Sequence, residues 1–255
     1  MKQIPNLFTL LNLFFGCLAI VFTLQNGIMI TVDSTGIQLI DMPEKIWLSS
    51  LFIGLAAVVD FLDGFVARLF KVQSEMGKEL DSLADVVSFG VAPSMIIYQF
   101  LRLSFSQEEG GIDTSVLWLA PAFILPCAAA YRLAKFNLQT NNEHSFKGVP
   151  TPAIGLFLAS FPLIYWNVNE AWVLNLLLNK WFLYGIILVL SYLMLSNLPF
   201  MSLKFKDFSF RRNIPKIVLL LSAAIAFIFL QWLAVPIIFV VYVVLSLLTP
   251  RKSYL

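Results

Sequence analysis

The sequence contains few charged residues, one histidine and two cysteines. Charged residues make up 13% of its 255 residues, against about 25% in soluble domains, which excludes an ordinary water-soluble domain. The scarcity of histidine and cysteine also excludes a zinc site built from clustered ligands of these two types. Because Cys17 and Cys127 both lie in apolar runs, we interpret them as small, buried apolar side chains.

Apolar residues are abundant instead. They make up 59% of the chain and give a mean hydropathy of +0.84. Apolar runs of about 17–25 residues can cross the hydrocarbon core of a membrane as helices. We therefore predict an all-α, polytopic integral membrane helix bundle, with one domain over residues 1–255, a core at about 4–200 and a C-terminal helix pair at about 214–249. About eight transmembrane helices are predicted, at residues 7–31, 46–70, 80–104, 115–137, 151–168, 181–199, 214–232 and 234–249.

Positive charges are concentrated on one predicted side of the membrane. Of the 17 lysine and arginine residues, only Lys45, Arg102 and Lys180 lie on the predicted outer side. Because cytoplasmic loops carry an excess of these residues, the bias predicts that both termini are cytoplasmic. The basic residues follow the topology, so the net charge of +2 does not indicate nucleic-acid binding. Residues 200–213 alternate aromatic and basic side chains, which predicts an interfacial segment on membrane lipid or a solvated loop.

Four aspartates interrupt the second and third apolar runs. A charged side chain near the bilayer centre costs about 2.5–3.5 kcal/mol on insertion scales, so four of them need a compensating partner. Residues three and four apart share a helix face, which predicts two polar stripes joined by a short turn. The first stripe contains Asp60, Asp63, Gly64 and Ala67 with Arg68 at its edge, and the second contains Gly77, Asp81 and Asp85.

The two stripes should meet at matched depths. At about 1.5 Å per residue, Asp63 and Asp81 lie about 10 Å from the turn, and Asp60 and Asp85 lie about 15–16 Å from it. Carboxylate oxygens suit Mg²⁺ or Mn²⁺, and two such ions would offset four negative charges. Two divalent cations can bridge a phosphoryl group, and an arginine such as Arg68 can pair with phosphate in a fork geometry. A proton relay, a packing role or a cation-translocation path are the alternatives.

The pattern D-x2-D-G-x2-A-R-x8-G-x3-D-x3-D, from Asp60 to Asp85, resembles the signature of the CDP-alcohol phosphotransferase family. The resemblance implies an enzyme that moves a phosphatidyl or similar group from a CDP-linked donor to an alcohol and releases CMP. It implies that Asp60, Asp63 and Asp81 are metal ligands, and that Asp85 is a ligand and also the base on the incoming hydroxyl. Under the same resemblance, the cytidine and pyrophosphate would be bound by Gly64, Ala67, Arg68 and Gly77, with Asp63.

Other segments are similar to the phosphatidylserine synthases of this family. They are Pro5-Asn6 with Thr9, Asn12 and Gly16, and the segments 88–93, 131–137 and 146–152. This similarity implies transfer from CDP-diacylglycerol to L-serine. Asn6, Thr9 and Asn12 share one face of the first predicted helix and should face inward, where they could contact the nucleotide or bridge helices. The cations that could bind the serine carboxylate are Arg132 and Lys135, although Lys135 stands where arginine is more common and both could simply anchor the helix end. Asn137, Thr151 and Ser88 could bind the ammonium or hydroxyl group, or cap helices.

Two other functions stay open. The acceptor could be glycerol phosphate, inositol phosphate or another amino alcohol, although a phosphorylated acceptor would need more cations than the sequence offers. A cation transporter could use the aspartates as a path, although the arginine in the motif and the absence of an internal repeat argue against it. We also expect a homodimer, with the active site facing the cytoplasm.

Overall fold

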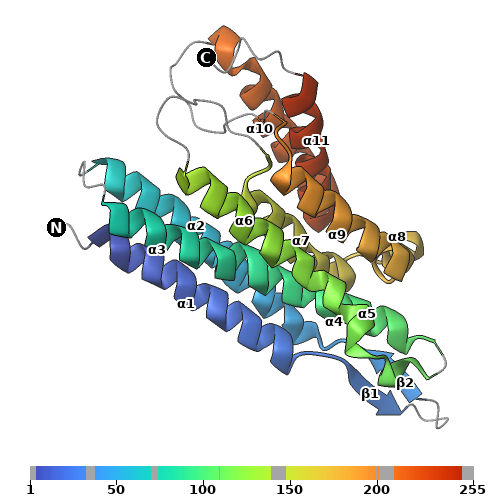
Figure 1. Cartoon of the computed structure of the whole chain (residues 1–255). Coiled ribbons are helices and arrows are strands. Elements are labelled where there is room, and N and C mark those ends of the chain that lie inside the picture. Colours follow the sequence, from blue (N-terminus) through green and yellow to red (C-terminus); the bar gives the residue numbers. More distant parts are fainter. Residues whose placement is uncertain are drawn as a thin grey trace.

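The computed structural model describes residues 4–32, 38–69, 74–108, 110–138, 148–198, 200 and 210–248. The chain is mostly helical, and its long helices run side by side (Figure 1). The helices are α1 (Ile4–Gln25), α2 (Trp47–Leu69), α3 (Glu75–Asp85), α4 (Ala92–Ser106), α5 (Val116–Leu119), α6 (Ile124–Leu138), α7 (Thr151–Asn167), α8 (Ala171–Leu177), α9 (Lys180–Leu195), α10 (Phe210–Leu230) and α11 (Ala234–Leu248).

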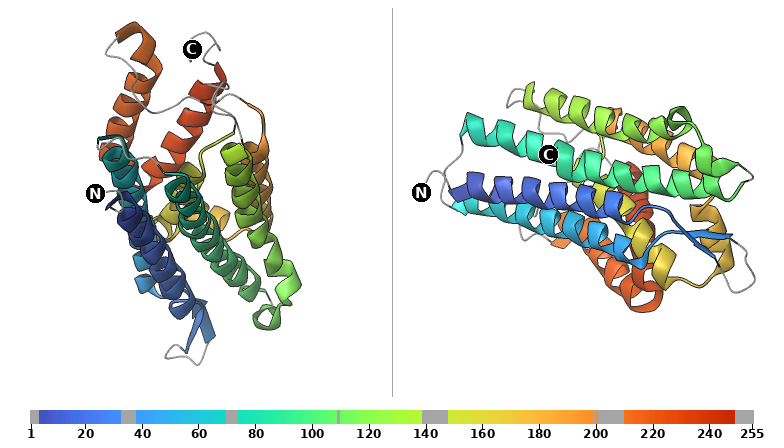
Figure 2. Two further views of the ribbon diagram at one scale, coloured as in Figure 1. Left: turned by 60° about the vertical axis from the view of Figure 1, so that its left-hand side comes forward. Right: turned by 90° about the horizontal axis from the view of Figure 1, so that it is seen from below.

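One β-hairpin departs from the all-helical prediction. Strands β1 (Met29–Val32) and β2 (Gln38–Asp41) pair antiparallel, with Met29 opposite Asp41. The run predicted as a helix to residue 31 therefore leaves the helix at Gln25. Asn26 and Gly27 are poor helix formers, and the β-branched residues that follow them favour an extended chain. The hairpin lies at the end of the bundle opposite the start of α1 (Figures 1 and 2).

The third predicted span is longer than its apolar run. A continuous helical segment covers Glu75–Ser106 and passes through a π-helical turn at Val86–Val91, directly after Asp85. Ser74 caps its start, because its hydroxyl accepts a hydrogen bond from the Gly77 backbone N–H at 3.0 Å. Pro93 has no backbone N–H to donate, and the wider π turn before it lets the helix continue through this position.

Within the described residues, five helical segments are long and apolar enough to cross a membrane, or up to six if the pair α8–α9, bent by 64°, is one span. The five are Pro5–Gln25, Glu44–Val66, Glu75–Ser106, Val116–Leu138 and Leu221–Leu248. Helices α7 and α9 have 17 and 16 residues, which corresponds to about 26 and 24 Å and is short for a hydrocarbon core of about 30 Å. Eight crossings with cytoplasmic termini therefore stay a prediction.

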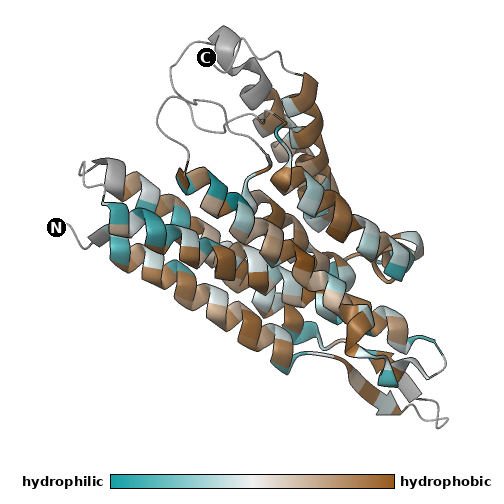
Figure 3. Ribbon diagram, viewed as in Figure 1, coloured by the Kyte–Doolittle hydropathy of each residue, from teal (hydrophilic) through white to brown (hydrophobic). Residues whose placement is uncertain are grey.

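Buried aromatic and small side chains hold the bundle together around α7. Phe89, Phe100 and Phe161 are each 1% exposed or less, and the rings of Phe100 and Phe161 meet edge to face at 5.9 Å. A Cβ atom on Gly155 would lie 3.0 Å from the Phe89 ring, so α7 packs closely against the π turn. Figure 3 shows a mostly apolar bundle whose polar residues gather where α1, α2 and α3 meet.

The two cysteines are exposed, which corrects the prediction that they are buried. An apolar residue in a membrane protein need not be buried in protein, because lipid is as apolar as the protein interior. Of the segment 200–213 that we predicted as interfacial or as a solvated loop, residues 201–209 lie outside the described residues, and α10 begins at Phe210.

Candidate active site

The predicted acidic cluster forms between α2 and α3. One carboxylate oxygen from each of Asp60, Asp63 and Asp81 lies within 4.8 Å of the others. Asp63 is 7% exposed, and the other two are half-buried. This spacing lets three acids share one cation, and their all-oxygen donor set fits Mg²⁺ or Mn²⁺.

Asp85 is not one of the three acids in this group, but it belongs to the same electrostatic cluster. It is 7% exposed, lies one helical turn beyond Asp81 and interacts electrostatically with Asp60, Asp81 and Asp63. Because its surroundings are acidic and buried, its negative charge needs cations or hydrogen-bond donors nearby.

Helix α1 supplies such donors, because it packs against both α2 and α3 (Figure 2). The Thr9 hydroxyl donates to Asp63 Oδ2 at 3.0 Å, and Asn12 Nδ2 donates to Asp85 Oδ1 at 3.4 Å. Both donors are buried, at 3% and 0% exposure. The same face of α1 therefore orients Asp63 of α2 and Asp85 of α3.

The same face of α1 fits closely against the π turn. The Ser88 hydroxyl donates to the Asn12 backbone carbonyl at 3.0 Å, and a side chain at Gly16 would collide with that hydroxyl. Thr9, Asn12 and Gly16 are spaced by three and four residues, so they follow one helix face. Asn12 was predicted, with Asn6 and Thr9, to face inward and to contact the nucleotide or bridge helices, and in the structure it joins α1 to Asp85 and to Ser88.

A cavity of about 470 Å³ opens beside the cluster. It is lined by Pro5, Asn6, Thr9, Asp63, Gly64, Ser74, Glu75, Gly77, Lys78 and Asp81. Most of the residues predicted to bind the nucleotide therefore line this one cavity, and they come from α1, α2 and α3. A Cβ on Gly64 would meet nothing within 4 Å, so this glycine leaves the α2 backbone open to a ligand. The side chains of Ala67 and Arg68 lie outside the described part of the chain.

Apart from Pro5, which belongs to the segment that is similar to phosphatidylserine synthases, three lining residues were not predicted. Ser74 caps α3, Glu75 follows it, and Lys78 donates from Nζ to the Asn137 backbone carbonyl at 3.1 Å. Of these three, only Ser74 has a recognisable sequence signal. A serine directly before a helix can cap the backbone N–H three residues later, as Ser74 does for Gly77.

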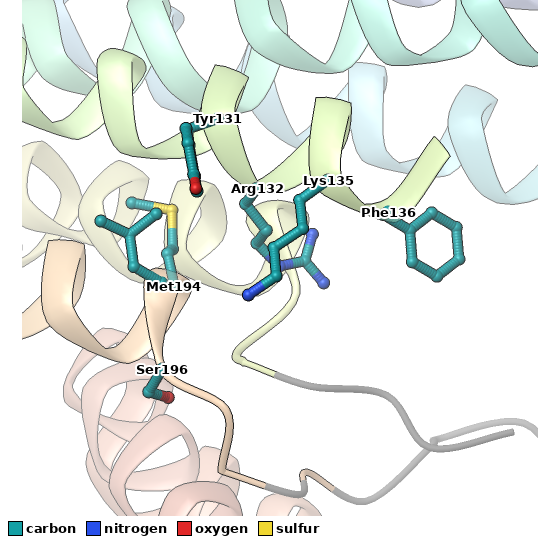
Figure 4. A pocket seen from close by; sticks show the side chains of 7 residues that line it. Tyr131, Arg132, Lys135, Phe136, Met194 and Ser196 are labelled. Carbon is teal, nitrogen blue, oxygen red and sulfur yellow. The ribbon is translucent and has the colours of Figure 1, made fainter. Parts of the chain in front are cut away.

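A second, smaller pocket contains the predicted acceptor cations (Figure 4). Its lining residues are Tyr131, Arg132, Lys135, Phe136, Met194, Leu195 and Ser196. Figure 4 shows Arg132 and Lys135 extending together from α6, while Phe136 points away from them. Lys135 Nζ donates to Asn197 Oδ1 at 3.1 Å.

Arg132 links this pocket to the acidic cluster. Its Nη1 donates to the Thr151 hydroxyl at 3.0 Å, and its guanidinium interacts electrostatically with Asp85. Its Nε is buried and has no hydrogen-bond partner among the described residues. A buried donor without a partner is costly, so this nitrogen is suited to bind an anionic ligand.

Gly148 explains why Thr151 reaches Arg132. Its φ is +78°, a conformation that glycine adopts without strain, and a side chain there would collide with the Met194 carbonyl. The Gly148 N–H donates to the Leu198 carbonyl at 3.0 Å, and the Val149 N–H donates to the Leu193 carbonyl at 3.1 Å. These two hydrogen bonds join the start of α7 to the end of α9, beside the pocket that Arg132 and Lys135 line.

Asn137 and Ser88 make contacts between helices. Asn137 Nδ2 donates to the Ser82 hydroxyl at 2.9 Å and lies 3.4 Å from both carboxylate oxygens of Glu79, which joins α6 to α3. Ser88 is fully buried against α1. Neither residue lines the pocket of Arg132 and Lys135, and their contact with serine stays a prediction.

The family model described as CDP-alcohol phosphatidyltransferase matches residues 2–196. The chain therefore belongs to this family of membrane-embedded transferases, which confirms the prediction of family and of an enzyme. A CDP-diacylglycerol–serine O-phosphatidyltransferase from Helicobacter pylori strain J99 is 35% identical over 202 residues, which are 78% of this chain and 72% of that protein. Proteins of the same name from Bacillus subtilis strain 168 and Methanocaldococcus jannaschii are 33% and 37% identical over 171 and 141 residues. These alignments cover 65% and 55% of this chain, and 78% and 63% of those proteins.

Proposed function

We propose that the protein transfers the phosphatidyl group of CDP-diacylglycerol to L-serine, giving phosphatidylserine and CMP, at a site open to the cytoplasm. The observation that carries this proposal is the cluster of Asp60, Asp63 and Asp81 beside a cavity of about 470 Å³, which is suited to a nucleotide pyrophosphate. Asp85 lies one helical turn beyond Asp81 and interacts electrostatically with Arg132, a buried side chain suited to a carboxylate. The names of the relatives support the same two substrates.

The donor would occupy the cavity between α1, α2 and α3. Asn6, Thr9, Gly64 and Gly77 line it beside Asp63 and would contact the cytidine and phosphates. Ala67 and Arg68 continue the α2 stripe one turn further on, and Arg68 would pair with a phosphate.

Asp60, Asp63 and Asp81, with Asp85 beside them, would hold two divalent cations, Mg²⁺ or Mn²⁺. Such ions, when bound, offset the charge of the pyrophosphate and of the departing phosphate. The acids alone would repel the anionic donor, so their number in so small a space is itself an argument for cations.

The acceptor would enter from the pocket on α6. Arg132 and Lys135 would hold the serine carboxylate, so that the serine hydroxyl lies toward Asp85. Asp85 would accept the hydroxyl proton as the serine oxygen forms a bond to the phosphorus that carries diacylglycerol. The bond from that phosphorus to the oxygen of the CMP phosphate breaks, and CMP leaves. Asn12 holds the carboxylate of Asp85 in place for this step.

The transfer needs no covalent enzyme intermediate, because donor and acceptor can be bound together. Burial of Asp85 and Asn12 limits the access of water, which favours transfer to serine over hydrolysis of the donor. Trapping of a phosphatidyl group on a protein side chain would exclude this direct displacement.

We further propose a single catalytic membrane domain of eight spans, with both termini cytoplasmic, that forms a homodimer. The bias in lysine and arginine supports the orientation. Labelling of single cysteines at either terminus in sealed vesicles tests the topology, and native mass spectrometry tests the dimer.

The reaction is tested with purified protein, CDP-diacylglycerol, Mn²⁺ and a panel of labelled alcohols. We expect lipid product from L-serine, with one CMP released per phosphatidylserine formed. A product from glycerol phosphate, inositol phosphate or ethanolamine, and none from serine, would refute the proposed acceptor. Metal flux into sealed vesicles without release of CMP would instead indicate a transporter.

A further inference from the structure

One hydrogen bond holds the guanidinium of Arg132. Its Nη1 donates to the Thr151 hydroxyl at 3.0 Å. A guanidinium carries five N–H donors, yet the Arg132 side chain makes no other hydrogen bond among the described residues, and its buried Nε has no partner there. An arginine has many rotamers, so this single contact selects the direction in which the remaining donors point.

Thr151 is a firmly held partner for this arginine. It is the first residue of α7, and it is fully buried. The turn before it is joined to the end of α9 by the backbone hydrogen bonds of Gly148 and Val149. The Ser160 hydroxyl of α7 donates to a carbonyl of its own helix, whereas the Thr151 hydroxyl accepts from Arg132 on α6. The Thr151 side chain therefore makes a contact between helices rather than one within its own helix.

Arg132 lines the predicted acceptor pocket, but Thr151 does not. Arg132 shares this pocket with Lys135 (Figure 4), and Thr151 is not among the lining residues. The hydrogen bond of Lys135 to Asn197 is exposed, so water can replace it. The bond between Arg132 and Thr151 is partly buried, so its loss leaves donor and acceptor less well compensated. A change at Thr151 should therefore reach a ligand in this pocket through Arg132.

We propose that Thr151 is a positioning residue for the acceptor site: its hydroxyl fixes the Arg132 guanidinium so that the unpaired Nε–H faces the carboxylate of the acceptor. The proposal rests on the proposed function, because that function assigns Arg132 to the serine carboxylate. A guanidinium that is already oriented loses less side-chain entropy when the ligand binds, and its planar fork of N–H donors matches the shape of a carboxylate. This role differs from the direct contact with serine that the sequence left open for Thr151.

The test is Thr151→Val in the full-length protein, which keeps the branched shape and removes the hydroxyl. We expect KM for serine to rise by about three- to tenfold, as for the loss of one hydrogen bond. We expect kcat and KM for CDP-diacylglycerol to change by less than about twofold, because only the acceptor site is altered. Thr151→Ser keeps the hydroxyl and should restore the wild-type KM for serine. Thr23→Val is the matched control, since Thr23 is buried on α1 and its hydroxyl donates to the Ala19 carbonyl of the same helix.

A double-mutant cycle shows whether Thr151 acts through Arg132. Activity is measured as kcat/KM at serine concentrations below KM, so that variants that bind serine weakly stay measurable. Arg132→Ala should lower kcat/KM for serine by more than Thr151→Val does, and Thr151→Val in that background should add less than about twofold. Thermal unfolding of each variant shows whether the fold is kept. If Thr151→Val lowers the unfolding temperature, Thr151→Ala, which also lacks the hydroxyl, is measured in its place.

Four outcomes would overturn the proposal. They are an unchanged KM for serine in Thr151→Val, an equal rise in KM for the donor, a Thr151→Ser variant as impaired as Thr151→Val, or effects of the two substitutions that multiply in the double mutant. Multiplying effects would indicate that Thr151 contacts serine directly. If Arg132→Ala itself keeps the wild-type KM for serine, the proposed acceptor site falls together with this inference. If only Thr151→Val lacks an effect, the acceptor site stands and the inference alone is refuted.

Discussion

Replacement of Thr9 by valine should weaken metal binding, although Thr9 is not itself one of the acidic ligands. The substitution keeps the branched shape and removes the hydroxyl that donates to Asp63 Oδ2 at 3.0 Å. Thr9 is 3% exposed, so water cannot easily replace the lost donor. A hydrogen bond to a charged group contributes about 1.5–3 kcal/mol. Loss of a residue that supports a metal ligand typically lowers affinity by about 10–100-fold.

The assay is Mn²⁺ binding by titration calorimetry on purified protein without CDP-diacylglycerol, so that a contact between Thr9 and the nucleotide does not contribute. We expect the dissociation constant to rise within that 10–100-fold range. Thr23→Val is the control, because Thr23 is a fully buried threonine on the same helix whose hydroxyl donates to the Ala19 carbonyl at 2.8 Å. Equal Mn²⁺ affinities in Thr9→Val, Thr23→Val and the wild type would refute the role of Asp63 as an oriented ligand.

Three further substitutions test other parts of the site. Asp81→Ala should abolish turnover, since it removes one of three clustered carboxylates, and near-normal phosphatidylserine synthesis would rule out the cation site. Asp85→Asn should lower kcat by at least about 100-fold, the range for loss of a general base, with little change in donor binding; an unchanged kcat would remove the base role. Gly148→Ala should destabilise the protein by more than about 1 kcal/mol, because φ is +78° and the new side chain would collide with the Met194 carbonyl. An unaltered thermal midpoint of that variant would show that the turn before α7 is not required.

The acidic cluster could be predicted because it depends mostly on local geometry. Asp60 and Asp63 share a face of one helix, Asp81 lies on the next helix, and only residues 70–74 separate the two helices along the chain. Helical periodicity is set by backbone hydrogen bonds and depends little on the rest of the fold. The spacing of Thr9, Asn12 and Gly16 could be recognised for the same reason.

Helix ends were predicted less well than helix faces. The run to residue 31 looked apolar enough for a helix, yet the chain leaves the helix at Gln25 and pairs Met29–Val32 with β2. A strand is stabilised by the partner that it pairs with, and hydropathy carries no information on pairing. The π turn after Asp85 could not be predicted either, because a helical repeat of 3.6 residues does not distinguish it.

The sequence by itself determined the family, the membrane setting and the two acidic stripes, since these follow from composition and from spacings within single helices. Only the tertiary structure decided which neighbours each polar group has. Asn12 donates to Asp85 across 73 positions of sequence, Asn137 binds α3, and Arg132 of α6 donates to Thr151 of α7. Such contacts depend on how whole helices pack, and packing is chosen by the summed shape of many side chains, which no short stretch of sequence contains.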